Sequence, residues 1–80
     1  MDATLDTAVA DLVDALDAIS DPQKRYQASR ETETAVAAGI RGVRQRIAVE
    51  LKTGGLKWRE VGEIMGNVSA QRAFQISRSE

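Results

Sequence analysis

The stretch of sequence that decides the fold is residues 56–76, LKWREVGEIMGNVSAQRAFQI. Apolar residues in its first part recur at spacings of three and four, the period of an amphipathic helix. They are Val61, Ile64 and Met65. Gly66-Asn67 interrupts the period, and Ser69 is a residue type that often caps the start of a helix. The stretch therefore predicts two short helices joined by a turn, near residues 58–65 and 70–78.

The second predicted helix has a buried face and a polar outer face. Residues three and four positions apart share one face of a helix, so Ala73 and Ile76 are expected to be buried. The outer face is expected to carry Gln71, Phe74, Gln75 and Arg78. In the major groove of DNA, Gln pairs with an adenine edge and Arg with a guanine edge, each through two hydrogen bonds. The expected phosphate contacts are Arg72 on the flank of this helix, Lys57, Arg59 and the cap region at Ser69.

At these residues the chain resembles the helix-turn-helix of actinobacterial regulators that look like region 4 of sigma-70 factors. The positions that match the pattern of this family are Leu56, Trp58, Glu60, Val61, Gly62, Met65, Gly66, Val68, Ser69, Gln71, Arg72, Ala73, Gln75 and Ile76. The resemblance covers roughly the last 40 residues well and the segment from Asp21-Pro22 more loosely. It implies an all-α domain that regulates transcription by binding a specific sequence of double-stranded DNA through a helix-turn-helix at residues 57–79.

Three local features affect the geometry of this motif. Lys57 stands where the family usually has a Ser or Thr cap, so Glu60 completes only half of a capping box. Asn67 makes the turn one residue longer than its commonest form. Gly62 removes a side chain where a second helix could cross closely.

Other interpretations of the same stretch remain open. Gly66-Asn67 is also an ordinary helix C-cap, and residues 56–76 would then form a helical hairpin with no role in DNA binding. The chain is alternatively a protein-interaction module that binds RNA polymerase or a sigma factor without reading a DNA sequence. Phe74 could contact a thymine methyl group, or pack under the N-terminal helix or against a dimer partner. Within the DNA-binding class, the sequence does not separate a transcription factor from a mobile-element regulator or a recombination factor.

Composition argues against catalysis and metal binding. The 80 residues contain no Cys and no His, which removes the usual metal ligands and the usual catalytic base. We therefore expect a protein that is not an enzyme, that needs no cofactor and that acts in the cytoplasm, at the nucleoid. No apolar run approaches the roughly 18 residues of a membrane span. Residues 1–40 hold three Lys/Arg and eight Asp/Glu, whereas residues 41–80 hold eight Lys/Arg and four Glu, which favours a nucleic-acid face in the second half.

The N-terminal segment, residues 1–20, is predicted to be an amphipathic helix separate from the DNA-binding domain at residues 21–80. Its apolar residues follow a heptad-type spacing of four, three, four and three. They are Leu5, Val9, Leu12, Leu16 and Ile19. This stripe either packs on its own domain or forms the seam of a homodimer, and we expect the homodimer because one short recognition helix reads few base pairs.

A long helix is predicted between these two parts. Asp21 is expected to cap it, Pro22 to open it and Lys52 to end it, with a kink or split near residues 29–34, where the sequence is polar. Its apolar stripe consists of Val36, Ile40, Val43, Ile47 and Leu51. A core of three helices is expected from Leu51, Leu56, Val61, Ile64, Met65, Val68, Ala73 and Ile76, with Trp58 at its edge.

Overall fold

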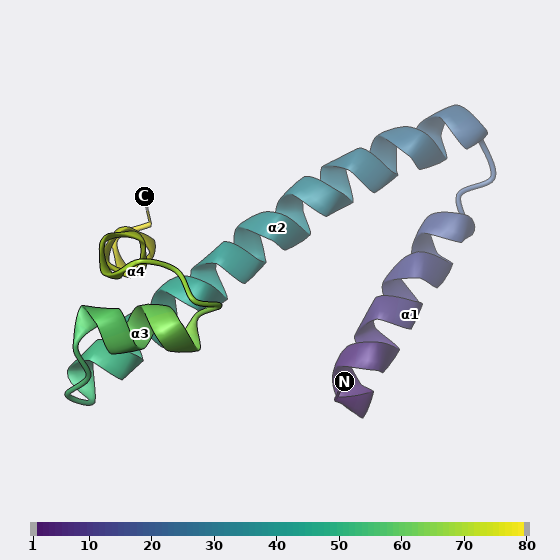
Figure 1. Ribbon diagram of the computed structural model, residues 1–80. Coiled ribbons are helices and arrows are strands. Elements are labelled where there is room, and N and C mark those ends of the chain that lie inside the picture. The colour runs from purple at the N-terminus through teal and green to yellow at the C-terminus, as the bar shows by residue number, and fades with distance from the viewer. Residues whose placement is uncertain (1, 80) are drawn as a thin grey trace. The chain divides into compact units, whose positions relative to one another are not determined.

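The computed structural model describes residues 2–79, and within that range it contains four helices and no strand. The helices are α1 (Ala3–Asp17), α2 (Pro22–Thr53), α3 (Trp58–Ile64) and α4 (Ala70–Ser77) (Figure 1). The predicted all-α class is therefore confirmed, and the helix bounds agree with those predicted from the sequence to within three residues. None of the helices in the described range is long and apolar enough to span a membrane.

The connection between α1 and α2 forms as the sequence predicts. The carboxylate of Asp21 accepts a hydrogen bond from the backbone N–H of Gln23 at 3.0 Å. Pro22 occupies the first helical position, where its missing N–H would have no partner inside the helix. Asp2 caps α1 in the same way, because its side chain accepts from the N–H of Thr4 at 2.7 Å. Both helix starts are thus fixed by an aspartate.

The predicted split near residues 29–34 is wrong, since α2 continues as one helix through this segment. Its hydroxyl groups bond back to the helix: Ser29 Oγ donates to the carbonyl of Tyr26 at 2.6 Å, and Thr34 Oγ1 to that of Arg30 at 3.1 Å. The segment lacks apolar residues because most of it faces solvent. Low hydrophobicity therefore signals an exposed length of helix here and not a break.

The chain forms two compact units, Met1–Ala35 and Val36–Glu80, with the boundary inside α2. In the first unit, the end of α1 lies against the first turns of α2. Val13 and Leu16 line a shallow hollow together with Pro22 and Tyr26. Leu12, Leu16 and Ile19 are half-buried. Leu5, Val9 and Val13 remain exposed, at 57%, 53% and 48%.

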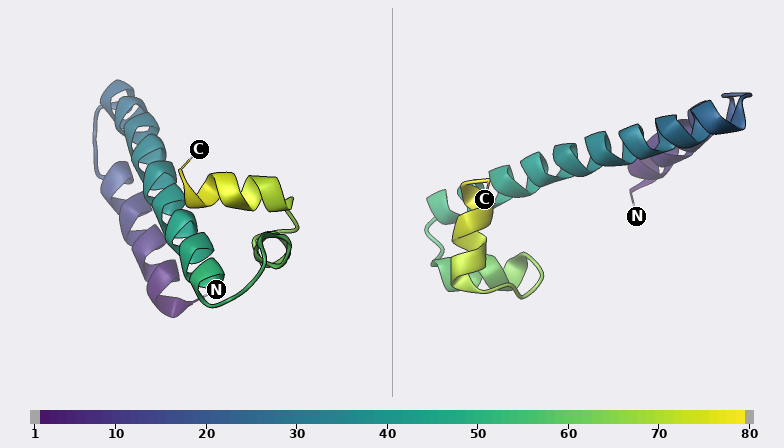
Figure 2. Two further views of the ribbon diagram at one scale, coloured as in Figure 1. Left: turned by 90° about the vertical axis from the view of Figure 1, so that its left-hand side faces the viewer. Right: turned by 90° about the horizontal axis from the view of Figure 1, so that it is seen from above.

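The second unit holds the core of the molecule. Ala48 of α2, Val61 of α3 and Ala73 of α4 are fully buried and contact one another. The half-buried residues that pack around them are Leu51, Leu56, Trp58, Met65, Val68 and Ile76. Figure 2 shows α3 and α4 gathered at the C-terminal end of α2, as this shared core requires. Most of the predicted core, and Trp58 at its edge, is confirmed.

Ile64 is the predicted core residue that the structure places elsewhere, because it is 60% exposed. The buried face of α3 includes Gly62, which lets the backbone of the following turn approach. This shifts the centre of the buried face away from Ile64, which lies about 200° around the helix from Gly62. Ala48 is the core residue that the apolar pattern missed, since its small side chain adds little to a hydrophobic stripe.

The apolar stripe of α2 is mostly exposed. Of its members only Leu51 packs against the core. The other four keep between 38% and 46% of their surface accessible, and they are Val36, Ile40, Val43 and Ile47. The helix turns the face of Ala48 and Leu51 toward α3 and α4, and Ile47 lies about 100° around the helix from Ala48. Ala48 and Leu51 of α2 therefore make the contact with α3 and α4, and the other four residues of the stripe keep much of their surface exposed.

Candidate nucleic-acid interface

The N-terminus of α3 has only one of the two hydrogen bonds of a capping box. Lys57 occupies the N-cap position, and its side chain makes no capping hydrogen bond. The Glu60 carboxylate accepts from the backbone N–H of Lys57 at 3.0 Å. This is the half capping box that the sequence predicts. Lys57 and Arg59 are both exposed at this end of the helix.

The turn after α3 depends on two residues in the left-handed region. Gly66 has φ of 91° and Asn67 has φ of 59°. Glycine adopts this region without strain, and Asn tolerates it better than most other residues. The chain then reverses so that the N–H of Val68 donates to the carbonyl of Gly62 at 3.0 Å. The longer turn is thereby tied directly to α3.

Gly62 is required because the returning backbone lies against it. A Cβ atom at this position would overlap the carbonyl oxygen of Val68 and lie 3.1 Å from that of Ser69. The predicted close approach is confirmed, although the neighbour is the turn leading into α4 and not a crossing helix. Together with the buried Val61, this contact holds α3 and α4 in one arrangement.

Both ends of α4 are anchored. Ser69 Oγ accepts from the N–H of Arg72 at 3.0 Å, so the predicted N-cap is confirmed. At the other end, Gln45 Nε2 of α2 donates to the carbonyl oxygen of Ser77 at 3.3 Å. Ala73 fixes the inner face by complete burial. The helix therefore has little freedom to rotate about its axis.

The predicted base-contacting residues lie mostly at the surface of α4. Gln71 and Arg78 are exposed, as are Arg72 on its flank and the Ser69 cap. Gln75 is half-buried. Helical spacing places Gln71, Gln75 and Arg78 opposite the Ala73 and Ile76 side. The result is a polar outer face on a helix whose inner face is fixed.

Phe74 contacts the indole of Trp58, a neighbour that the sequence did not indicate. Their ring centroids are 5.5 Å apart at an interplanar angle of 81°, an edge-to-face arrangement. Arg78 lies over the Phe74 ring at 5.5 Å, and Lys52 over the Trp58 ring at 5.4 Å. Phe74 still has 40% of its surface exposed. The spacing of four residues between Phe74 and Arg78 is a sequence signal for the contact between Arg78 and the Phe74 ring.

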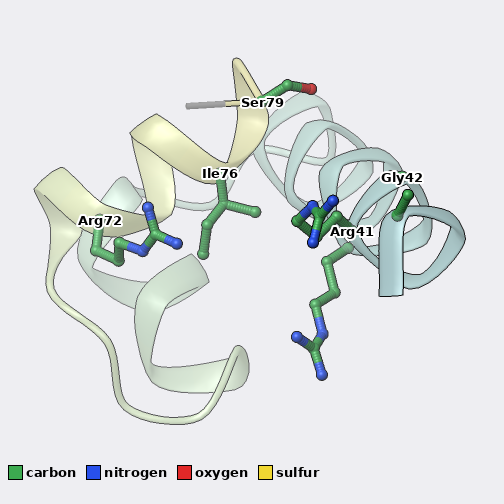
Figure 3. A pocket seen from close by; sticks show the side chains of 7 residues that line it. Arg41, Gly42, Arg72, Ile76 and Ser79 are labelled. Carbon is green, nitrogen blue, oxygen red and sulfur yellow. The ribbon is translucent and has the colours of Figure 1, made fainter. Parts of the chain in front are cut away.

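A cleft lies on the opposite flank of α4, between α4 and α2. Its volume is about 460 Å³. Arg41 and Arg44 of α2 and Arg72 of α4 line it, and Ala38, Gly42, Ile76 and Ser79 complete the lining. In Figure 3, Arg72, Ile76 and Ser79 come from the α4 side and face Arg41 and Gly42 of α2. The sequence prediction of site residues missed Arg41 and Arg44, because only the fold brings them near α4.

Charge divides between the two units. The first unit, residues 1–35, holds three Lys/Arg and eight Asp/Glu, and residues 36–80 hold eight Lys/Arg and four Glu. The net formal charges are therefore −5 and +4. No group of His, Cys, Asp and Glu in the described part of the chain could hold a metal ion.

Comparison with known proteins adds no relative. No protein-family model, no curated protein and no solved structure matches the chain.

Proposed function

We propose that the chain is a transcriptional regulator that binds double-stranded DNA and reads a specific sequence with α4 in the major groove. One observation carries this proposal: α4 presents Gln71, Gln75 and Arg78 on a side away from its buried face, while its caps and core fix its orientation. A helix that is to read base edges needs such a rigid mounting, because bidentate hydrogen bonds tolerate little misplacement.

The charge distribution supports the same function. The second unit is positive, and a basic surface beside a reading helix attracts the phosphate backbone. Arg72, Lys57 and Arg59 would supply phosphate contacts, which position the protein without carrying sequence information. The proposed place of action is the cytoplasm, at the nucleoid.

Selection of bound duplexes from a random pool, followed by mobility-shift titration, tests this function. Gln71→Ala or Arg78→Ala should lower affinity for the selected site by about 1–3 kcal/mol and leave random DNA almost unaffected. Arg72→Ala should weaken selected and random DNA alike. Gln27→Ala on α2, in the first unit, is the control and should change neither. Equal losses on both kinds of DNA from Gln71→Ala and Arg72→Ala would refute the assigned roles.

A homodimer belongs to this proposal, because a single recognition helix contacts too few base pairs for a selective site in a genome. Leu5 and Val9 favour it, since about half of each side chain's surface is accessible in one chain. The proposed seam also includes Leu12, Leu16 and Ile19, which are half-buried. Two copies related by a two-fold axis would present two copies of α4 about 34 Å apart along one face of the DNA.

A second candidate function rests on α1. This helix combines exposed apolar residues with aspartates and has no Lys or Arg, features that fit a basic protein partner such as a surface of RNA polymerase or a sigma factor. Failure to enrich any duplex from the random pool, together with saturable binding to purified polymerase, would favour this function over DNA reading.

A further inference from the structure

The cleft between α2 and α4 concentrates positive charge. Arg41, Arg44 and Arg72 line it, and none of the other lining residues within the described range 2–79 is acidic. Its floor is made of small or aliphatic residues, which leaves room for a ligand between the two helices (Figure 3). Guanidinium groups on both sides of one space attract an anion that enters between them. Guanidinium groups also match the geometry of phosphate oxygens better than ammonium groups do.

The place of the cleft relative to α4 identifies the anion. Arg72 and Phe74 lie on either side of Ala73, each about 100° around the helix from it. Arg72 faces the cleft, and Phe74 faces Trp58, whose ring lies under the ammonium group of Lys52. The outer face of α4 thus lies between two basic flanks. A helix in a major groove, which is about 12 Å wide, likewise lies between two phosphate backbones.

We propose that the cleft is a phosphodiester-binding site in which Arg41 and Arg44 act with Arg72 on one backbone of the DNA, on the flank of α4 that lies opposite Phe74. This inference rests on the proposed function and extends it to α2. It assigns Arg41 and Arg44 to affinity for any duplex and not to the choice of sequence.

The competing explanation for these arginines is structural. Ile76 lies in the last turn of α4 and Ser79 lies just beyond its C-cap, and positive side chains near a helix C-terminus interact favourably with the helix dipole. If Arg41 and Arg44 act only in this way, their removal lowers the stability of the free protein and affects DNA binding only through unfolding. Thermal unfolding of the free protein therefore separates the two roles.

The test compares two double variants that lose the same charge from the same helix. Arg41→Ala with Arg44→Ala removes the arginines on the α2 side of the cleft, whereas Lys24→Ala with Arg30→Ala removes two exposed cations of α2 that belong to the first unit and do not line it. Affinity for a selected and a random duplex is measured between about 50 and 200 mM salt. We expect the cleft variant to lose roughly ten- to a hundredfold on both duplexes and to shallow the salt slope by up to about 1.8. The control should change the slope far less.

Phosphate-ethylation interference on the selected site locates the contact. Wild type should show interfering phosphates on both strands bordering the major groove, and the cleft variant should lose only those on one border. Unchanged slope and footprint in a cleft variant that binds the duplex would overturn the inference while leaving the proposed function intact. A lower midpoint of unfolding with unchanged binding by the folded fraction would also overturn it, in favour of the structural role. Wild type that binds no duplex would refute both proposals.

Discussion

Gly62 is the residue at which backbone packing outweighs helix propensity. Replacing a helical Gly by Ala usually stabilises a helix by about 1 kcal/mol. At Gly62 the new methyl group would overlap the carbonyl of Val68, so we expect Gly62→Ala to destabilise the protein by about 1–3 kcal/mol. Gly39 of α2 is the matched control, because nothing lies within 4 Å of its added Cβ. Gly39→Ala should stabilise, and urea denaturation of both variants measures the opposite signs.

Val61 should contribute more to stability than its larger neighbour Ile64. Val61 is fully buried, and Ile64 is 60% exposed. Val61→Ala removes two methyl groups and leaves a cavity, at a cost of about 2–3 kcal/mol, whereas Ile64→Ala should cost less than about 0.5 kcal/mol. Chemical denaturation of the two variants tests this order. Similar losses would mean that Ile64 is covered in solution.

At the scale of elements, the two short helices differ in how well they are capped. Ser69 caps α4 through a 3.0 Å hydrogen bond, so Ser69→Ala should cost about 1 kcal/mol and Ser69→Asp, which keeps an acceptor, much less. Lys57 lacks a capping bond, so Lys57→Ser should complete the box with Glu60 and stabilise by about 0.5–1 kcal/mol. Thermal unfolding in the absence of DNA measures all three. Stabilisation by Ser69→Ala would contradict this assignment of the cap.

The limits of α2, α3 and α4 could be predicted from sequence because local chemistry sets them. Asp21, Pro22 and Ser69 act within one turn of their own position, and the structure shows each in its expected place. Packing faces are different, because they depend on which neighbour the helix meets. Ile64 follows the helical period, yet Gly62 draws the neighbouring backbone to its own side of α3.

The same distinction holds for the candidate site. The outer face of α4 follows from helical periodicity alone, so the positions of Gln71 and Arg78 on it could be predicted from the sequence. Arg41 and Arg44 precede Arg72 by about thirty positions, and their common cleft exists only once α2 and α4 share a core. The edge-to-face contact of Trp58 with Phe74 likewise required the reversal of the chain at Gly66-Asn67.

At the scale of the whole molecule, opposite charge on the two units gives each a separate task in the proposed regulator. The first unit is acidic at −5, so it is repelled by phosphate and suits contacts with protein. The second is basic at +4 and carries α4. Binding to DNA should therefore fall steeply with salt, whereas self-association through an apolar seam on α1 should not.

The assembly test uses the exposed end of the α1 seam. Leu12 and Leu16 are half-buried in a single chain, so changing them would disturb the first unit as well as a dimer. Leu5 and Val9 are 57% and 53% exposed, which makes them the cleaner positions. Leu5→Asp with Val9→Asp should give monomers by sedimentation at micromolar concentration and greatly weaken binding to a two-fold symmetric site, with helicity unchanged. If the variant still formed the dimer, each new carboxylate would be buried in the seam without a partner, which costs several kcal/mol.

The matched control adds the same charge to the other face of α1. Thr7 and Ala10 lie opposite the seam, so Thr7→Asp with Ala10→Asp should leave the dimer and its DNA affinity intact. Equal dissociation by both pairs would point to general repulsion between acidic units and not to a seam. Wild type that sediments as a monomer while binding a single half-site with full affinity would end the dimer proposal. In that outcome, the exposed leucine and valine side chains of α1 would instead bind a basic protein surface, as the second candidate function proposes.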